Sequence, residues 1–424
     1  MTNEEVSCVV WRQSAVARWL TRRIEGGSDL LAGARDLSIP PGLRRSWLRN
    51  GRVRALAAYR VRKEKSTKDA EATAASLRSL PLLVRPRSVE VITREPIEVS
   101  GGGYCDDAYD PDQPVRQAQV FLRSRSAFGT GVEANREVRG GKGEMAQVVD
   151  VEGDWWLGHP DFGCIKVHYW RGPRPDDVSH GTAILGILGA TGKNTAGAEG
   201  MVPRASIGVV QVDEDPCSTW ERLLELADNL PPASVVLLPI KFKKNRVPAL
   251  PFEALEIGRD IARLLGKRKI YLIESAGNGR KNLNEHIRSR FLKSWVHSGA
   301  ILVGAGEPKV GKRCGDSNYG RRVDLHNWGR CVVTCDSSGD YNYGFTGTSA
   351  AGAIVAGVVA CIASVLAANG YRPLSPRRMR RLLVRTGYLR SEGIGPRPDV
   401  EAALTRLRRQ GYRFAAREGD QAGD

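Results

Sequence analysis

The chain has 424 residues, of which 41% are hydrophobic, so it is long enough for two or three domains or for one large α/β domain with extensions. Its formal net charge of +17 favours acidic partners but says nothing about the fold. Eight cysteines without a CxxC pair exclude a disulfide scaffold, and we expect free thiols.

Residues 1–115 are predicted to form an N-terminal extension with its linker. The first residues lack the apolar core of a signal peptide, so we expect a cytoplasmic protein. Apolar spacing predicts helices over residues 15–37 and 68–80, and strands at 82–84 and 89–92. Residues 44–68 carry ten Lys or Arg side chains with two aromatic residues between them. They could form a nucleic-acid patch, but without a binding-fold motif we favour a solvated helix face.

Residues 116–410 show the alternation of strands and helices that is typical of a βαβ domain. Short apolar runs predict strands at residues 145–151, 165–170, 206–212, 235–240, 269–275, 300–304 and 332–334. Helices are predicted between them, at 219–230 and 252–265. We therefore expect a doubly wound α/β domain, with a mostly parallel sheet of six or seven strands and helices on both faces. Residues 411–424 read as a polar tail.

One apolar run, residues 350–368, is nearly long enough to span a bilayer and carries no charge. It is rich in Gly, Ala and Ser, so we interpret it as a central helix of the α/β domain and expect no membrane association.

Three polar residues fall at the predicted edge of the sheet, in the order Asp150, His180 and Ser349. A serine hydroxyl needs a neighbouring imidazole to accept its proton, and the imidazole needs a carboxylate to fix its tautomer. Ser349 also begins a helix, whose free backbone N–H groups suit an oxyanion. Asn278, in a Ser-Ala-Gly-Asn-Gly turn, could donate a further hydrogen bond to it. Together these groups predict acyl transfer.

Over roughly two-thirds of its length the sequence resembles the subtilisin-like serine peptidases, the subtilases. Four segments in the family's order carry the resemblance: Val149-Asp150 followed by Gly158-His159-Pro160-Asp161-Phe162, then His180-Gly181-Thr182, Ser275-Ala276-Gly277-Asn278 and Gly347-Thr348-Ser349-Ala350-Ala351. The resemblance implies a triad of Asp150, His180 and Ser349, with Asn278 in the oxyanion hole. It also implies a serine endopeptidase whose substrate is a peptide or protein.

The sequence departs from the family's pattern at several positions. Glu152 stands where glycine is usual, and Ala353 stands where a proline usually follows the serine. Asp154 is a nearby rival for the triad acid, and His159 is interpreted as structural. The chemistry requires no cofactor. Structural calcium is common in the family, but its sites cannot be mapped on this sequence.

Alternatives remain at the level of function. The fold could be a binding scaffold without catalysis, or a peptidase with added nucleic-acid binding through residues 44–68, although we do not expect nucleic acid as a partner. The N-terminal extension could be an inhibitory propeptide or a permanent docking domain, and the second fits a chain without a signal peptide better. The sequence does not indicate the oligomeric state.

Overall fold

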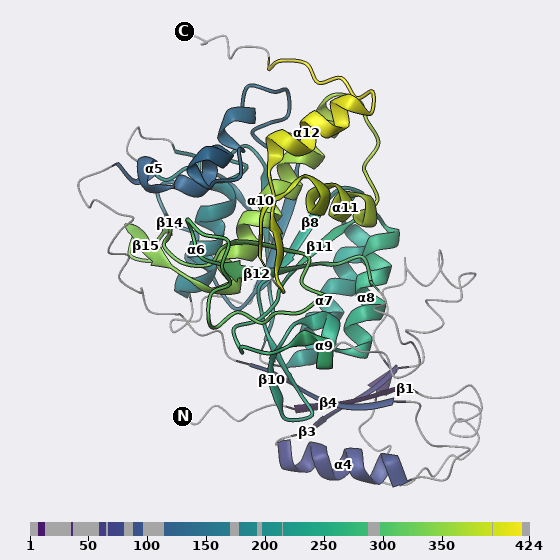
Figure 1. The fold of residues 1–424 in the computed structure, drawn as a ribbon. Helices are drawn as coiled ribbons and strands as arrows, with labels where there is room; N and C mark the ends of the chain where they lie inside the picture. The colour runs from purple at the N-terminus through teal and green to yellow at the C-terminus, as the bar shows by residue number, and fades with distance from the viewer. Residues whose placement is uncertain are drawn as a thin grey trace. The chain divides into compact units, whose positions relative to one another are not determined.

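The computed structural model describes residues 7–12, 35–36, 59–64, 67–79, 88–95, 114–169, 178–192, 197–213, 215–286, 297–391 and 393–417. The chain divides into two compact units (Figure 1). The first contains residues 1–96, 212–230 and 241–265, and the second contains 97–211, 231–240 and 266–424. The first unit therefore combines the N-terminal extension with two later segments, whereas the sequence suggested a boundary near residue 115.

The second unit is built on a seven-stranded parallel sheet. Its strands, in spatial order, are β13 (Leu325–Trp328), β12 (Ile301–Gly306), β11 (Tyr271–Ser275), β8 (Val235–Leu238), β5 (Gln147–Glu152), β7 (Ser206–Gln211) and β6 (Ile165–Tyr169). With helices on both sides, this confirms the predicted α/β class. Strand β5 lies between β7 and β8, and the chain continues first to the β7 side of β5 and later to its β8 side. In open α/β sheets, ligands bind at the carboxyl ends of the strands where the strand order reverses in this way.

Helix α10 (Gly347–Ala368) is the central helix of this unit. It contacts five strands of the sheet as well as helices α6 (Val178–Gly189) and α12 (Val400–Arg409) (Figure 1). Among the described helices, α10 is long and apolar enough to cross a membrane, but 94% of its apolar window is buried inside the protein. The helix therefore lies in the protein core, as its small residues predict.

The remaining elements of the second unit are short or peripheral. They are α5 (Val115–Ala118), α9 (Leu283–His286), α11 (Pro376–Thr386), the hairpin of β14 (Val332–Cys335) and β15 (Tyr341–Phe345), and the hairpin of β16 (Tyr388–Ser391) and β17 (Gly395–Arg397). The strand predicted at residues 332–334 exists, but the prediction was wrong to place it in the main sheet. β14 pairs with β15 instead, and β13 takes the last position in the sheet.

The first unit contains a six-stranded antiparallel sheet. Its order is β10 (Val247–Leu250), β9 (Phe242–Lys244), β4 (Ser88–Arg94), β1 (Ser7–Arg12), β3 (Tyr59–Glu64) and β2 (Arg35–Asp36). Helix α4 (Thr67–Ser79) packs its Ala70, Ala74 and Leu77 against one face, through Val9 and Val91. Helix α7 (Pro216–Asn229) also contacts β1 and β4, and α8 (Glu256–Lys267) is a further described helix of this part of the chain.

The structure tests only some of the sequence predictions for the extension, because part of it lies outside the described residues. The helix predicted at 68–80 is α4, and the strand at 89–92 is β4. The helix at 15–37 and the strand at 82–84 lie largely or wholly outside the described residues, although residues 35–36 form β2. Within the basic segment, residues 59–64 form strand β3 rather than a helix face, and residues 44–58 lie outside the described part. Six of the described cysteines are free, but Cys331 is disulfide-bonded, which corrects the expectation of free thiols at that residue.

Strand β9 joins the N-terminal extension to a segment that lies about 150 residues later in the chain. Ile92 of β4 is in register with Lys244 of β9, and the Lys244 ammonium pairs with Glu90 at 3.0 Å. Val91 and Asn245 exchange hydrogen bonds of 3.0 and 3.1 Å, and the Arg94 guanidinium donates to the Val212 carbonyl at 2.8 Å. The extension is thus part of a continuous sheet.

We expect the extension to stay bound after the chain is cut in its Gly-rich linker near residues 101–103. The sheet bonds between β4 and β9 and the buried Arg94 contact do not depend on the linker. Limited proteolysis followed by size-exclusion chromatography tests this, and both fragments should elute together. Separate elution of the N-terminal fragment under native conditions would contradict a permanent docking role and favour a removable propeptide.

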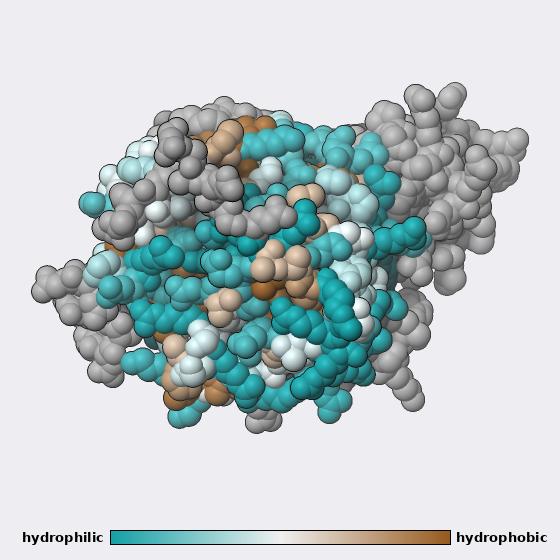
Figure 2. Space-filling model, turned by 90° about the horizontal axis from the view of Figure 1, so that it is seen from above, coloured by the Kyte–Doolittle hydropathy of each residue, from teal (hydrophilic) through white to brown (hydrophobic). Residues whose placement is uncertain are grey.

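The exposed surface carries few large apolar side chains. Hydrophilic residues predominate on the face shown in Figure 2, with small scattered hydrophobic patches. Among the described residues, the exposed large hydrophobic side chains are Met145, Val167 and Val310. Single exposed apolar residues are normal and do not by themselves mark an interface.

Candidate active site

Strand β5 delivers two carboxylates to the same face of the sheet. Asp150 and Glu152 are two residues apart, and side chains alternate along a strand, so both point the same way. Both are fully buried, with 0% of their surface exposed. The strand continues to Glu152, so Asp150 does not end it as the sequence suggested.

His180 lies in the first turn of α6 and is 4% exposed. Its Nδ1 lies 2.6 Å from Glu152 Oε2, the distance of a strong, charge-assisted hydrogen bond. The sequence predicted that Asp150 would orient His180, whereas in the structure Glu152 occupies that position. The longer Glu side chain reaches the imidazole from two residues further along β5. The ring of Phe345, at the end of β15, stands edge-on to His180 with ring centroids 5.5 Å apart.

The hydrogen bond described for Asp150 is with Trp155, whereas the one described for Glu152 is with the imidazole of His180. Asp150 Oδ2 accepts a 2.8 Å hydrogen bond from the Trp155 indole, and its carboxyl group lies close enough to Glu152 for the two groups to interact electrostatically. Burial, and then the charge of Glu152, raise the pKa of Asp150 well above its ordinary value. Burial beside a second carboxyl group thus favours the neutral form of Asp150.

Ser349 is the third residue of α10 and is 6% exposed. Its hydroxyl donates to the Pro239 carbonyl at 3.2 Å, directly after strand β8. Among the described residues, the hydrogen-bond partner of the Ser349 hydroxyl is thus a backbone carbonyl and not His180. Gly347 precedes Ser349 with φ +98°, and a Cβ there would lie 2.9 Å from the Asn278 amide nitrogen, so only glycine fits.

Asn278 lies in the turn after β11 and faces the start of α10. Its Oδ1 accepts hydrogen bonds from the backbone N–H and the hydroxyl of Thr348, both at 2.9 Å. Asn318 holds the same turn, since its Nδ2 donates to Ala276 O at 2.7 Å and its Oδ1 accepts from the Lys281 N–H at 2.7 Å. With its oxygen engaged, the Asn278 amide can present its N–H groups beside Ser349.

The other residues weighed from the sequence have structural partners. Asp154 Oδ1 accepts from the Trp155 N–H at 2.8 Å and so shapes the loop after β5. His159 Nδ1 accepts from the Asp161 N–H at 3.1 Å, and its Nε2 lies 2.9 Å from the Asp340 carbonyl. With Asp161 and Cys335, His159 forms a group of possible metal ligands. Because both ring nitrogens of His159 and one oxygen of Asp161 are already bonded, the group fits a structural role better than a metal site.

All the residues of the candidate site belong to the second unit. His180, Ser349 and Asn278 come from the starts of α6 and α10 and from the turn after β11, as predicted from the sequence. Glu152 is the residue that sequence reasoning missed as the histidine's partner. The signal was present, because the unusual glutamate stands two residues after Asp150 and therefore on the same strand face.

Comparison with known proteins bears on the family and the fold. The sequence model of the subtilase family matches residues 253–412. No curated protein matches the chain in sequence. The self-cleaved protease domain of PatA is 20% identical with a TM-score of 0.50, over 62% of this chain and 97% of that one. A point mutant of the PatA protease domain is 19% identical with a TM-score of 0.50, over 63% and 96%.

A further solved structure, a cold adapted subtilisin-like serine proteinase, is 18% identical with a TM-score of 0.47, over 61% of this chain and 91% of that chain. At the identities found, the likeness to the PatA domain shows the fold alone. The family match adds the sequence evidence for the segment that carries Asn278 and Ser349. By the sequence of residues 253–412 and by its α/β fold, the chain is similar to the subtilases, the subtilisin-like serine peptidases.

Proposed function

We propose that the protein is a serine endopeptidase that cleaves peptides or proteins through an acyl-enzyme. The subtilase family and fold support a serine peptidase in general terms. The observation that carries the specific proposal is the 2.6 Å bond between His180 Nδ1 and the buried Glu152 carboxylate. A histidine held this way presents its other ring nitrogen as a general base, which is what a serine nucleophile needs.

In the proposed mechanism Ser349 turns from Pro239 to His180 and attacks the scissile carbonyl. His180 takes the hydroxyl proton and later gives it to the leaving amine. Glu152 fixes the tautomer of His180 and stabilises its charged form. The oxyanion is held by the side-chain amide of Asn278 and by the backbone N–H of Ser349 at the start of α10. Water then releases the acyl group.

Asp150 has a supporting part in this proposal. The Trp155 indole holds the Asp150 carboxyl group, and we infer that Asp150 in turn supports Glu152, with which it interacts electrostatically. As a neutral acid it donates to Glu152 without adding a second charge to the buried site. The sequence-based assignment of Asp150 as the triad acid is thereby replaced, in the proposal, by a pair of carboxyl groups in which Glu152 touches the imidazole.

Replacement of Asn278 by alanine is expected to lower kcat by about 10²–10³-fold with a small change in KM, because the amide stabilises charge that develops in the transition state. Steady-state kinetics on a fluorogenic peptide measure both constants. Asn318→Ala is a useful comparison, since it loosens the turn that carries Asn278 without removing the donor, and its loss of kcat should be smaller. An unchanged kcat in Asn278→Ala would remove this residue from the oxyanion hole.

Digestion of a proteome-derived peptide mixture, read by mass spectrometry, tests the activity itself. New termini that the wild-type protein creates and Ser349→Ala does not create would support the peptidase and show its cleavage preference. The second candidate is a catalytically silent scaffold, favoured by one observation, the bond of the Ser349 hydroxyl to Pro239. Absence of any Ser349-dependent new termini would favour the scaffold.

Three further proposals concern the cofactor, the cellular location and the partners. No cofactor takes part in the chemistry above. We place the protein in the cytoplasm, and we expect peptide or protein substrates rather than nucleic acid or a membrane.

A further inference from the structure

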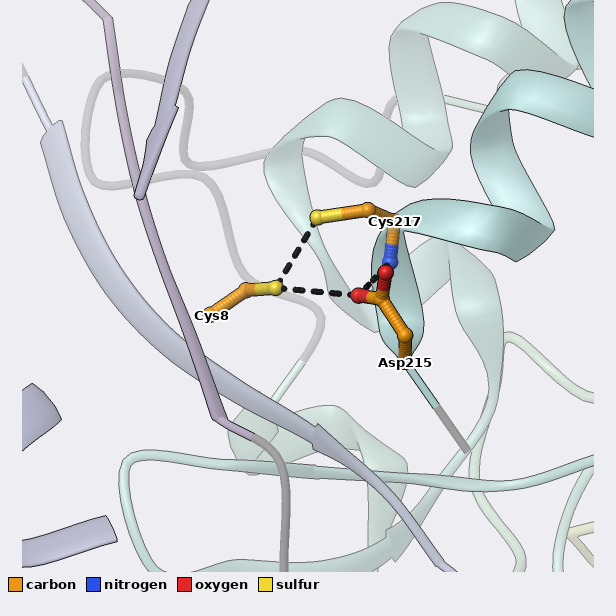
Figure 3. Close-up of side chains that lie close together, drawn as sticks. All are labelled: Cys8, Asp215 and Cys217. Carbon is orange, nitrogen blue, oxygen red and sulfur yellow. Dashed lines mark hydrogen bonds between the residues drawn. The ribbon is translucent and has the colours of Figure 1, made fainter. Parts of the chain in front are cut away.

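Three side chains outside the proposed active site meet in the first unit (Figure 3). Cys8 lies on β1, and Asp215 and Cys217 lie at the start of α7. The Cys8 sulfur is 2.9 Å from the Cys217 sulfur and 3.3 Å from Asp215 Oδ1. Both cysteines are free and fully buried, and they are 209 residues apart in sequence. The fold alone brings the two thiols together.

We propose that Cys8 and Cys217 are a redox-active pair that a peroxide converts into a disulfide, which ties strand β1 to helix α7. A disulfide has a sulfur–sulfur bond of about 2.05 Å, so the two sulfurs need to approach by less than about 1 Å. The inference does not depend on the proposed peptidase activity. It concerns the unit that joins the N-terminal extension to residues 212–230.

Asp215 gives the pair an acid–base group. The Asp215 carboxylate caps α7 by accepting a 2.9 Å hydrogen bond from the Cys217 N–H, and it also accepts a hydrogen bond from the Cys8 thiol. It also forms an ion pair with Lys63. Burial alone would raise the pKa of Asp215, but the bonds from Lys63 and from the Cys217 N–H outweigh it and hold that pKa below its ordinary value. The carboxylate is therefore ionised and in position to accept the proton of Cys8.

The reaction balances with hydrogen peroxide as the oxidant. The Cys8 sulfur attacks one oxygen of the peroxide and the oxygen–oxygen bond breaks. The proton of the Cys8 thiol passes through Asp215 to the departing oxygen, which is released as water, and Cys8 becomes a sulfenic acid. The Cys217 sulfur then attacks the Cys8 sulfur, the sulfur–oxygen bond breaks, and the Cys217 proton leaves with that oxygen as a second water. The two thiols lose two hydrogens in total, and the peroxide is reduced to two waters. Peroxide is small enough to reach the pair when the unit opens locally.

A metal ion is the competing occupant, since the three side chains can place one ligand atom each around a common point. Two thiolates on tetrahedral zinc lie about 3.8 Å apart, further than the sulfurs found here. The Lys63 ammonium also occupies the carboxylate that would have to bind the cation. The disulfide is therefore the better inference.

The test uses the full-length protein, reduced, treated with hydrogen peroxide, denatured and alkylated with N-ethylmaleimide. Peptide mapping by mass spectrometry should find a Cys8–Cys217 cross-linked peptide, and the wild type should lose two alkylation sites. Cys8→Ser and Cys217→Ser should abolish the cross-link. Cys361→Ser, which alters a buried free thiol in the second unit, is the matched control and should keep it.

Two further results decide the chemistry. Asp215→Asn keeps a residue that caps helices well, and it should slow cross-linking at least about tenfold; an unchanged rate would overturn the role of Asp215. Full alkylation of both thiols in peroxide-treated wild type would overturn the redox pair. So would bound zinc in the wild type that both cysteine variants lose, because it would assign the cluster to a metal.

Discussion

Replacement of Ser349 by alanine is expected to lower kcat by about 10⁶-fold, the loss that follows removal of a triad nucleophile. The fold should persist, because the substitution removes one hydroxyl whose hydrogen bond to Pro239 contributes about 1 kcal/mol. Hydrolysis of a fluorogenic peptide measures the rate, and thermal unfolding shows whether the variant is folded.

Ser364 on the same helix offers a matched control. It is a fully buried serine of α10 whose hydroxyl accepts a 3.0 Å bond from the Met145 N–H, away from the proposed site. Ser364→Ala should lose a little stability and keep the wild-type rate. Hydrolysis by Ser349→Ala at the wild-type rate would show that another group is the nucleophile.

The carboxyl pair gives the second large effect. Glu152→Gln is expected to lower kcat/KM by about 10⁴-fold, because an amide no longer fixes the His180 tautomer or stabilises its charged form. Asp150→Asn should cost less than about tenfold, since an amide can still accept the Trp155 bond and donate to Glu152 as the neutral acid does. Kinetics of both variants on the same peptide make the comparison.

The pH dependence separates the two carboxyl groups further. Because the pKa of Asp150 is raised, this group loses its proton only as pH rises through the raised value, and two negative charges then lie close together in the buried site. Asp150→Asn cannot ionise, so its activity should persist to higher pH than that of the wild type. A larger loss in Asp150→Asn than in Glu152→Gln would instead make Asp150 the charged partner of His180.

The raised pKa of Asp150 also makes the free energy of unfolding depend on pH. The folded protein keeps a proton on Asp150 that the unfolded chain releases above its ordinary pKa of 3.8. The unfolded state therefore binds fewer protons between 3.8 and the raised pKa, and the contribution of Asp150 to the free energy of unfolding falls as pH rises through this window. Asp150→Asn removes that dependence.

Local rules predicted much of the fold and of the candidate site. The glycine-flanked Thr348-Ser349 pair before a run of small apolar residues predicted the start of α10. The apolar runs became buried strands such as β7 and β8. These features depend on residues close in sequence, which is why the chain reveals them without a structure.

The missed features depend on distance in space. Whether Asp150 or Glu152 reaches His180 is decided by side-chain length across the gap between β5 and α6, which a motif does not contain. The pairing of β4 with β9 joins residues about 150 positions apart, and no local pattern marks it. Likewise, β14 has the composition of a buried strand, but its partner is the neighbouring β15.

An active-site-directed fluorophosphonate tests the central claim most directly. The folded wild-type protein should be labelled at Ser349, and both Ser349→Ala and His180→Ala should lose the label, because only a serine activated by the imidazole reacts. The label should be weak in Glu152→Gln and strong in Asp150→Asn. A wild-type protein that stays unlabelled, before and after limited proteolysis of the linker near residues 101–103, would contradict the account and favour a silent scaffold.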